Sequence, residues 1–97
     1  MPKPVVTIVV GSDSDLPIME GSASILTKAK VPFDVIIASA HRSLKYLQGI
    51  IKKTEKKGTK IFIAGAGSAA ALPGVIAAET TLPVIGVPVD SSALKGV

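Results

Sequence analysis

Residues 5–10, Val5-Val6-Thr7-Ile8-Val9-Val10, with the turn Gly11-Ser12-Asp13-Ser14-Asp15 that follows them, decide the fold class of this chain. The run consists of apolar and β-branched side chains and lacks the alternation of a half-exposed strand. Such a strand has both faces buried, as in a parallel sheet with helices on either side. A helix is expected to begin near Leu16 or Pro17, with Asp15 as a candidate cap.

The same unit of strand, turn and helix recurs along the chain. We expect further strands over 33–38, 61–64 and 84–87, and further helices over 44–57 and from about residue 72 or 73. Strands that alternate with helices predict an α/β fold with right-handed crossovers, here a three-layer sandwich whose parallel sheet has the flavodoxin-like order 2-1-3-4. We expect residues 1–97 to form a single α/β domain.

Local signals add detail to this fold. Asp34 in the second strand favours a position near a sheet edge, and Gly58 is expected to end the second helix. Helical spacing of apolar residues predicts which side chains face the sheet. In the first helix these are Leu16, Met19, Ala23 and Leu26, widened by Ile18 and Ile25, and in the second Leu44, Leu47, Ile51 and Thr54.

The composition excludes several classes of function. The 97 residues include no cysteine, a single histidine, His41, and only two phenylalanines and one tyrosine as aromatic residues. Thiolate chemistry and cysteine- or histidine-rich metal sites are therefore excluded, so we expect no bound metal. The scarcity of aromatic residues argues against a base-stacking surface for nucleic acid. A net charge of +4 favours anionic ligands, of which phosphates are the commonest, although the lysines of the second helix equally suit a solvated face.

No segment predicts export or membrane insertion. The apolar run after Pro4 is too short for a signal core. Residues 61–78 carry no charge, but their glycines, proline and alanines suit a buried strand, turn and helix better than a membrane span. We therefore expect a cytoplasmic protein with no membrane partner.

In a sheet of this order, ligands bind beyond the carboxyl ends of the strands, where three loops meet. In the first loop, Ser12, Ser14 and backbone N–H groups suit a phosphate. A carboxylate would repel a phosphate, so Asp15 suits either a helix cap or the hydroxyls of a sugar. The alternative for this loop is a plain capped turn.

The second loop contains Ser39, Ala40, His41 and Arg42. Arginine binds phosphate through a fork of donors. Histidine titrates near neutrality and can act as an acid and then as a base, and a neighbouring Arg42 would disfavour the imidazolium. A purely structural histidine remains the alternative.

The third loop, Gly65-Ala66-Gly67-Ser68-Ala69-Ala70, fits a loose dinucleotide-binding pattern, with Asp90 after the next strand as a ribose-binding candidate. The signal is weak, because glycine turns after strands are common and this one follows the third strand. The small residues alternatively let a flat ring approach the backbone in a narrow, dry pocket.

Taken together, these segments resemble a known family. Gly11-Ser12-Asp13-Ser14-Asp15, Ser39-Ala40-His41-Arg42, Ala64-Gly65-Ala66-Gly67, Leu72-Pro73-Gly74 and 82–88 occur in the same order as in the catalytic subunit of phosphoribosylaminoimidazole carboxylase. The bacterial members are carboxyaminoimidazole ribonucleotide mutases of purine biosynthesis. The resemblance runs from about Val5 to Gly96.

The resemblance implies an isomerase that moves a carboxylate of an aminoimidazole ribonucleotide from the exocyclic nitrogen to a ring carbon, through enclosed carbon dioxide. It implies that His41 transfers the protons and that no cofactor takes part, because no electrons move. It also implies a homo-oligomer, since family members are octamers. The residues that it assigns to substrate binding are Ser12, Ser14, Asp15, Ser39, Ala40, Arg42, Gly67 and Ser68.

The chain also departs from the family pattern. Ala71 stands where the family usually has a second histidine, Ser68 replaces a glycine, and Leu44 replaces a proline. Family members also continue past residue 94 with another strand and helices, so we expect this chain to be shorter and its fourth strand to be an open apolar edge.

Two other functions are weighed beside the isomerase. The first is a non-catalytic fragment of that enzyme that binds a ribonucleotide or phosphate, and the second is a dinucleotide-binding unit. A receiver-type signalling domain is disfavoured, because Gly65 stands where its phosphorylated aspartate should end the third strand.

Overall fold

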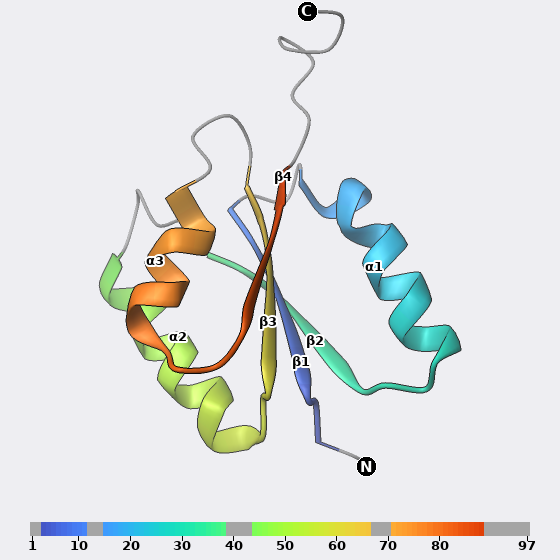
Figure 1. The fold of residues 1–97 in the computed structure, drawn as a ribbon, viewed down its shortest axis with the longest axis horizontal. Helices are drawn as coiled ribbons and strands as arrows, with labels where there is room; N and C mark the ends of the chain where they lie inside the picture. Colours follow the sequence, from blue (N-terminus) through green and yellow to red (C-terminus); the bar gives the residue numbers. More distant parts are fainter. Residues whose placement is uncertain (1–2, 12–14, 39–43, 67–70, 89–97) are drawn as a thin grey trace, which may run out of the picture.

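The computed structural model describes residues 3–11, 15–38, 44–66 and 71–88. Strands and helices alternate along the chain (Figure 1). They are β1 (Val6–Val10), α1 (Leu16–Lys28), β2 (Phe33–Ile37), α2 (Leu44–Lys57), β3 (Ile61–Ala66), α3 (Ala71–Glu79) and β4 (Val84–Pro88). The strands form a four-stranded parallel sheet of order β2-β1-β3-β4, which confirms the predicted α/β class and strand order.

The sheet lies between two layers of helix. Helix α1 covers one face, and α2 and α3 cover the other (Figure 1). Every residue of β1 is buried, as its unbroken apolar run predicts, because β1 is a central strand with helices over both faces. Strand β2 lies at an edge, as Asp34 predicts.

Two apolar clusters fill the spaces between the layers. The cluster under α2 and α3 is built on Val9, Phe62 and Ala64 of the sheet, and the one under α1 is built on Ile8 and Val10. Alternate residues of β1 therefore contribute to opposite clusters, as strand geometry requires.

Helix α2 ends as its sequence predicts. Gly58 has a φ of 120°, a conformation that L side chains rarely adopt. Its N–H donates to the Glu55 carbonyl at 3.2 Å, and the Thr59 N–H donates to the Thr54 carbonyl at 3.1 Å, which is the Schellman pattern. Helix α1 ends with the same pattern, but Lys30 occupies the position with positive φ (60°) in place of a glycine.

Two predictions about the helix faces are wrong. Ile25 is 69% exposed, because at 100° per residue it lies on the opposite side of α1 from Ala23. Leu44 is 47% exposed, because it is the first residue of α2 and projects past the buried turns of Leu47 and Ile51.

Several element boundaries also differ by one or two residues from those expected, since β1 begins at Val6, β2 ends at Ile37 and β4 ends at Pro88. Strand β3 continues to Ala66, since Gly65 and Ala66 still pair with β4. Helix α3 begins at Ala71, one or two residues early, with Pro73 in its first turn, where proline is tolerated. Across the described residues, no helix combines the length and apolarity needed to span a bilayer.

A pair of buried hydroxyls joins β1 to the segment just before β3. Thr7 is fully buried and Thr59 is 4% exposed, and their Oγ1 atoms lie 2.7 Å apart in a hydrogen bond. This bond satisfies polar atoms that would otherwise be stranded in the core.

Candidate functional site

The carboxyl ends of all four strands lie at one edge of the sheet. The last residue of β1, Val10, pairs with Ile37 and with Gly65, which in turn pairs with Val87. The last residues of these strands therefore lie side by side (Figure 1). This is the edge at which open parallel sheets bind ligands.

The helices that follow β1, β2 and β3 start at the same edge. Among the described helices, none carries an acidic residue in its first turn. The positive ends of the α2 and α3 dipoles are therefore not neutralised within the first turn, and α2 adds the cation Lys45, whereas Asp15 stands at the N-cap of α1. The edge is electrostatically suited to an anionic ligand.

Asp15 is the one predicted site residue that the structure describes. It stands at the N-cap position of α1, but its side chain makes no cap hydrogen bond. Its φ of −86° and ψ of −12° are helical, whereas a capping residue needs an extended backbone to reach the N–H groups of the first turn. The prediction that Asp15 caps α1 is therefore wrong.

The Asp15 carboxylate instead points back toward the end of β1. A Cβ built on Gly11 would lie 3.8 Å from Asp15 Oδ2. The carboxylate is half-buried over the carboxyl end of the central strand. There it is available to accept hydrogen bonds from a ligand such as a sugar hydroxyl.

The residue that precedes the second loop, Ala38, is buried and hydrogen-bonded to β1. Ala38 is 3% exposed, and its N–H donates to the Val10 carbonyl at 2.8 Å, one residue past the end of β2. This bond extends the β1–β2 pairing to the residue immediately before Ser39. The chain therefore enters the predicted histidine loop directly beside the end of β1.

The position of α3 depends on a close approach to β4. A Cβ on Gly86 would lie 3.3 Å from Pro73 Cβ and 3.4 Å from its Cγ, so a glycine lets the first turn of α3 sit against the strand. Leu72 and Ile76 of α3 are buried in the cluster between this helix and the sheet. These contacts fix the position of α3, which begins at Ala71.

The remaining predicted site residues lie outside the described ranges, and their roles stay predictions. They are Ser12, Ser14, Ser39, Ala40, His41, Arg42, Gly67 and Ser68. Asp90 of the dinucleotide hypothesis also lies outside them.

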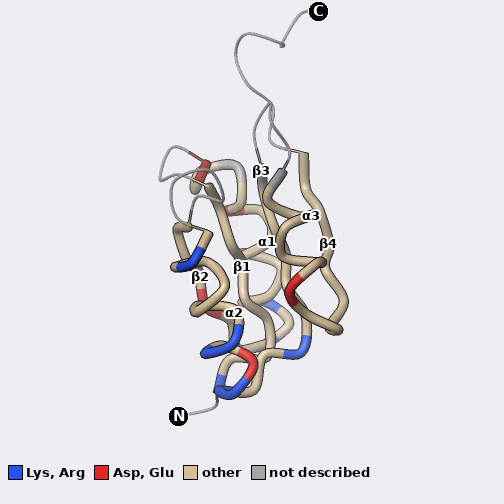
Figure 2. The backbone as a smooth tube through the Cα atoms, turned by 90° about the vertical axis from the view of Figure 1, so that its left-hand side faces the viewer, with Lys and Arg blue, Asp and Glu red and all other residues tan. Residues whose placement is uncertain are grey.

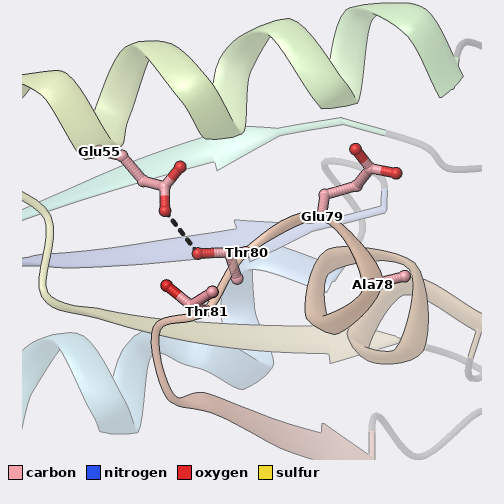
Figure 3. Close-up of a pocket in the computed structure, with 5 residues that line it drawn as sticks. All are labelled: Glu55, Ala78, Glu79, Thr80 and Thr81. Atoms are coloured by element: carbon pink, nitrogen blue, oxygen red, sulfur yellow. Dashed lines mark hydrogen bonds between the residues drawn. The ribbon is translucent and has the colours of Figure 1, made fainter.

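A hollow of about 370 Å³ at the opposite end of α2 and α3 was not predicted from the sequence. Glu55, Ala78, Glu79, Thr80 and Thr81 line it (Figure 3). The Thr80 hydroxyl donates to Glu55 Oε2 at 2.6 Å, and Gln48 Nε2 donates to Glu79 Oε2 at 3.1 Å. Both carboxylates therefore serve to tie α2 to α3. The partners in these two bonds lie 31 and 25 positions apart in the chain, and no local sequence pattern identifies such pairs.

The exposed side of α2 carries several lysines. Figure 2 shows lysines along α2, where Lys52, Lys53, Lys56 and Lys57 are exposed as predicted. Within the part of the chain that the structure describes, no three histidine, cysteine, aspartate or glutamate side chains come together as a metal site would require.

Comparison with known proteins agrees with this geometry. The family model described as AIR carboxylase matches residues 5–97. The chain belongs to the AIR carboxylase family. The match includes all four strands and the three loops predicted to form the site.

Several relatives extend well beyond the matched region. The N5-carboxyaminoimidazole ribonucleotide mutase of Pyrococcus horikoshii is 53% identical over 97% of this chain, which covers 53% of that protein. The phosphoribosylaminoimidazole carboxylase of Saccharomyces cerevisiae is 53% identical over the whole chain, which covers 17% of it. The chain thus spans about half the length of the mutase and a smaller part of the fungal enzyme.

A solved structure has the same fold. PurE of Treponema denticola superposes with a TM-score of 0.87 at 29% sequence identity, over 97% of this chain and 60% of that one. The flavodoxin-like arrangement predicted from the sequence is therefore the arrangement found in this family.

Proposed function

We propose that the chain forms the substrate-binding and catalytic α/β domain of a carboxyaminoimidazole ribonucleotide mutase of purine biosynthesis, acting in the cytoplasm. The observation that carries the proposal is the 53% identity to a protein of that name over 97% of the chain. The sheet edge supports it, since the first turns of α2 and α3 carry no acidic residue and suit the phosphate of a nucleotide.

The proposed reaction needs one group that gives and then takes a proton. His41 protonates the exocyclic nitrogen of the substrate, which releases carbon dioxide inside the site. The ring carbon attacks the carbon dioxide, and the ring proton then returns to His41. Holding carbon dioxide requires an enclosure that excludes water. No electrons move, so the reaction requires no redox cofactor.

Binding is divided between the loops at the sheet edge. Ser12, Ser14, Ser39 and Arg42 hold the phosphate, Ala40 forms part of the wall beside the ring, and Gly67 and Ser68 also bind the substrate. Asp15 accepts hydrogen bonds from the ribose hydroxyls. The failure of Asp15 to cap α1 supports this role, because its carboxylate is turned toward the end of β1.

The active form is proposed to be a homo-oligomer, because family members assemble into octamers. A second function, binding of the ribonucleotide without turnover, is favoured by two observations. The resemblance implies that Ala71 stands where the family usually has a second histidine, and the glycine turn after β3 equally suits binding alone.

The decisive experiment is a mutase assay on this chain beside a version extended at the carboxyl end to the length of its relatives. We expect conversion of the carboxylated ribonucleotide, and its loss in His41→Asn with the substrate Kd changed less than about threefold. Binding without conversion in either version would support the non-catalytic alternative. A rise in melting temperature with NAD but not with the ribonucleotide would overturn both in favour of a dinucleotide-binding unit.

Asp15→Asn tests the ribose contact, with Asp34→Asn as a matched control. Asp34 is also a half-buried carboxylate, but it lies in the amino-terminal half of β2, away from the proposed site. Losing hydrogen bonds from ligand hydroxyls to a charged acceptor costs about 1.5–3 kcal/mol, or roughly 10- to 150-fold in affinity. Equal effects of the two substitutions would refute the assignment.

A further inference from the structure

The first turn of α3 lies very close to β4. A Cβ built on Gly86 would lie 3.3 Å from Pro73 Cβ and 3.4 Å from Pro73 Cγ, closer than most Cβ atoms come to a neighbouring side chain. At Gly21, Gly49 and Gly74, by contrast, such an atom would meet nothing within 4 Å. Position 86 therefore admits a larger residue only if its neighbours move.

This contact lies one strand residue away from the sheet edge at which the site is proposed. Gly86 pairs with Ala64. The next pair along the two strands, Gly65 and Val87, is level with Val10 at the end of β1. A change in the space above Gly86 therefore acts directly beside the proposed site.

Two features keep α3 from adjusting locally to a larger residue at position 86. Pro73 Cβ and Cγ belong to a ring that is closed on the main chain, so they cannot rotate away as the end of a flexible side chain could. Leu72 and Ile76 are buried in the cluster between α3 and the sheet, and they hold the helix on that side. A Cβ at position 86 would therefore push the main chain of the first turn away from β4 by a few tenths of an ångström.

The main chain of this turn offers hydrogen-bond donors at the sheet edge. The first N–H groups of a helix have no partner within it, and Pro73 has no N–H, so the donors of the described first turn are those of Ala71 and Leu72. The turn contains no acidic residue that would neutralise the helix dipole. Both N–H groups therefore suit an anionic part of a ligand.

We propose that Gly86 is a positioning residue for ribonucleotide binding. Its missing side chain lets Pro73 seat the first turn of α3 against β4, which sets where the Ala71 and Leu72 N–H groups meet an anionic group of the ribonucleotide. The identity of the ligand rests on the proposed function. Misplacing a group by about 1 Å can cost about a hundredfold, so a shift of a few tenths of an ångström should weaken binding roughly three- to tenfold.

Calorimetric titration with aminoimidazole ribonucleotide, at a temperature at which circular dichroism shows each variant to be folded, tests this role. Gly86→Ala should raise the Kd roughly three- to tenfold. Adding Pro73→Ala, which removes the Cγ contact but not the Cβ contact, should recover part of the lost affinity. The double variant also serves if the single one does not fold, because its Kd should still exceed that of the unmodified chain.

Gly58→Ala is the matched control for lost stability. It is also destabilising, because Gly58 has a φ of 120°, but it lies just before the amino end of β3, far from the proposed site. Its Kd should stay close to that of the unmodified chain. Equal changes of Kd in Gly86→Ala and Gly58→Ala would overturn the proposal, because a purely structural role of Gly86 predicts that result.

Amide NMR spectra without ligand separate this inference from the proposed function. In Gly86→Ala, the amide signals of Ala71 and Leu72 should shift, whereas that of Ala78, near the other end of α3, should not. Unshifted signals from the first turn would overturn the inference alone. Failure of the unmodified chain to bind the ribonucleotide would overturn the proposed function, and with it the binding role of Gly86, even if the first-turn signals shift.

Discussion

Replacing Thr7 by valine removes one half of a hydrogen bond that joins residues 52 positions apart in the core. Valine has nearly the shape of threonine, so the substitution leaves the packing almost unchanged. The Thr59 hydroxyl, only 4% exposed, then loses its partner and has little access to water.

The expected cost follows from this burial. Leaving a buried hydroxyl unsatisfied destabilises a protein by about 1–3 kcal/mol, whereas replacing both partners by apolar groups of the same shape can be nearly neutral. Thr7→Val and Thr59→Val should each lower the free energy of unfolding by about 1–3 kcal/mol. The double variant should be closer to the unmodified chain than either single one is. For a domain of this size, about 1 kcal/mol corresponds to a Tm change of roughly 4–8 °C.

Urea unfolding followed by circular dichroism measures the free energy of unfolding of the unmodified chain, the two single variants and the double variant. Thr27→Val is the matched control, because the Thr27 hydroxyl bonds the Ala23 carbonyl at 2.8 Å on an exposed part of α1. It should change stability by less than about 0.5 kcal/mol. Additive effects of the Thr7 and Thr59 substitutions would show that the two hydroxyls are not coupled and would refute the reasoning.

Three further substitutions test the backbone geometry, each by thermal unfolding. Lys30→Gly should raise stability by about 1 kcal/mol, because a left-handed conformation strains an L residue by about that amount; an unchanged or lower Tm would contradict it. Gly58→Ala should lower stability by about 1–3 kcal/mol, because a φ of 120° excludes a side chain, and a stabilised variant would mean that the helix ends differently. Gly86→Ala should cost about 1 kcal/mol, because its Cβ would crowd Pro73, and a double variant with Pro73→Ala should recover part of that loss.

The candidate site was predictable in part, because its position follows from topology. Once strand order 2-1-3-4 is accepted, the segments after β1, β2 and β3 must leave the sheet at the same edge. The role of Asp15 was less predictable, since an aspartate before Leu16 suits a helix cap by sequence alone. Its helical backbone removed that option, and a local pattern does not reveal that conformation.

The sequence by itself determined the elements of this protein and their order. The apolar run of β1, the spacing within α2 and the glycine at position 58 act over a few neighbouring residues, so they can be interpreted without knowing the fold. Tertiary structure alone decided the contacts between distant elements: the Thr7–Thr59 bond, the ties from α2 to α3, and the approach of Pro73 to Gly86. The physical reason is that such contacts depend on the distances and angles at which layers pack, and residues far apart in the chain jointly set those quantities.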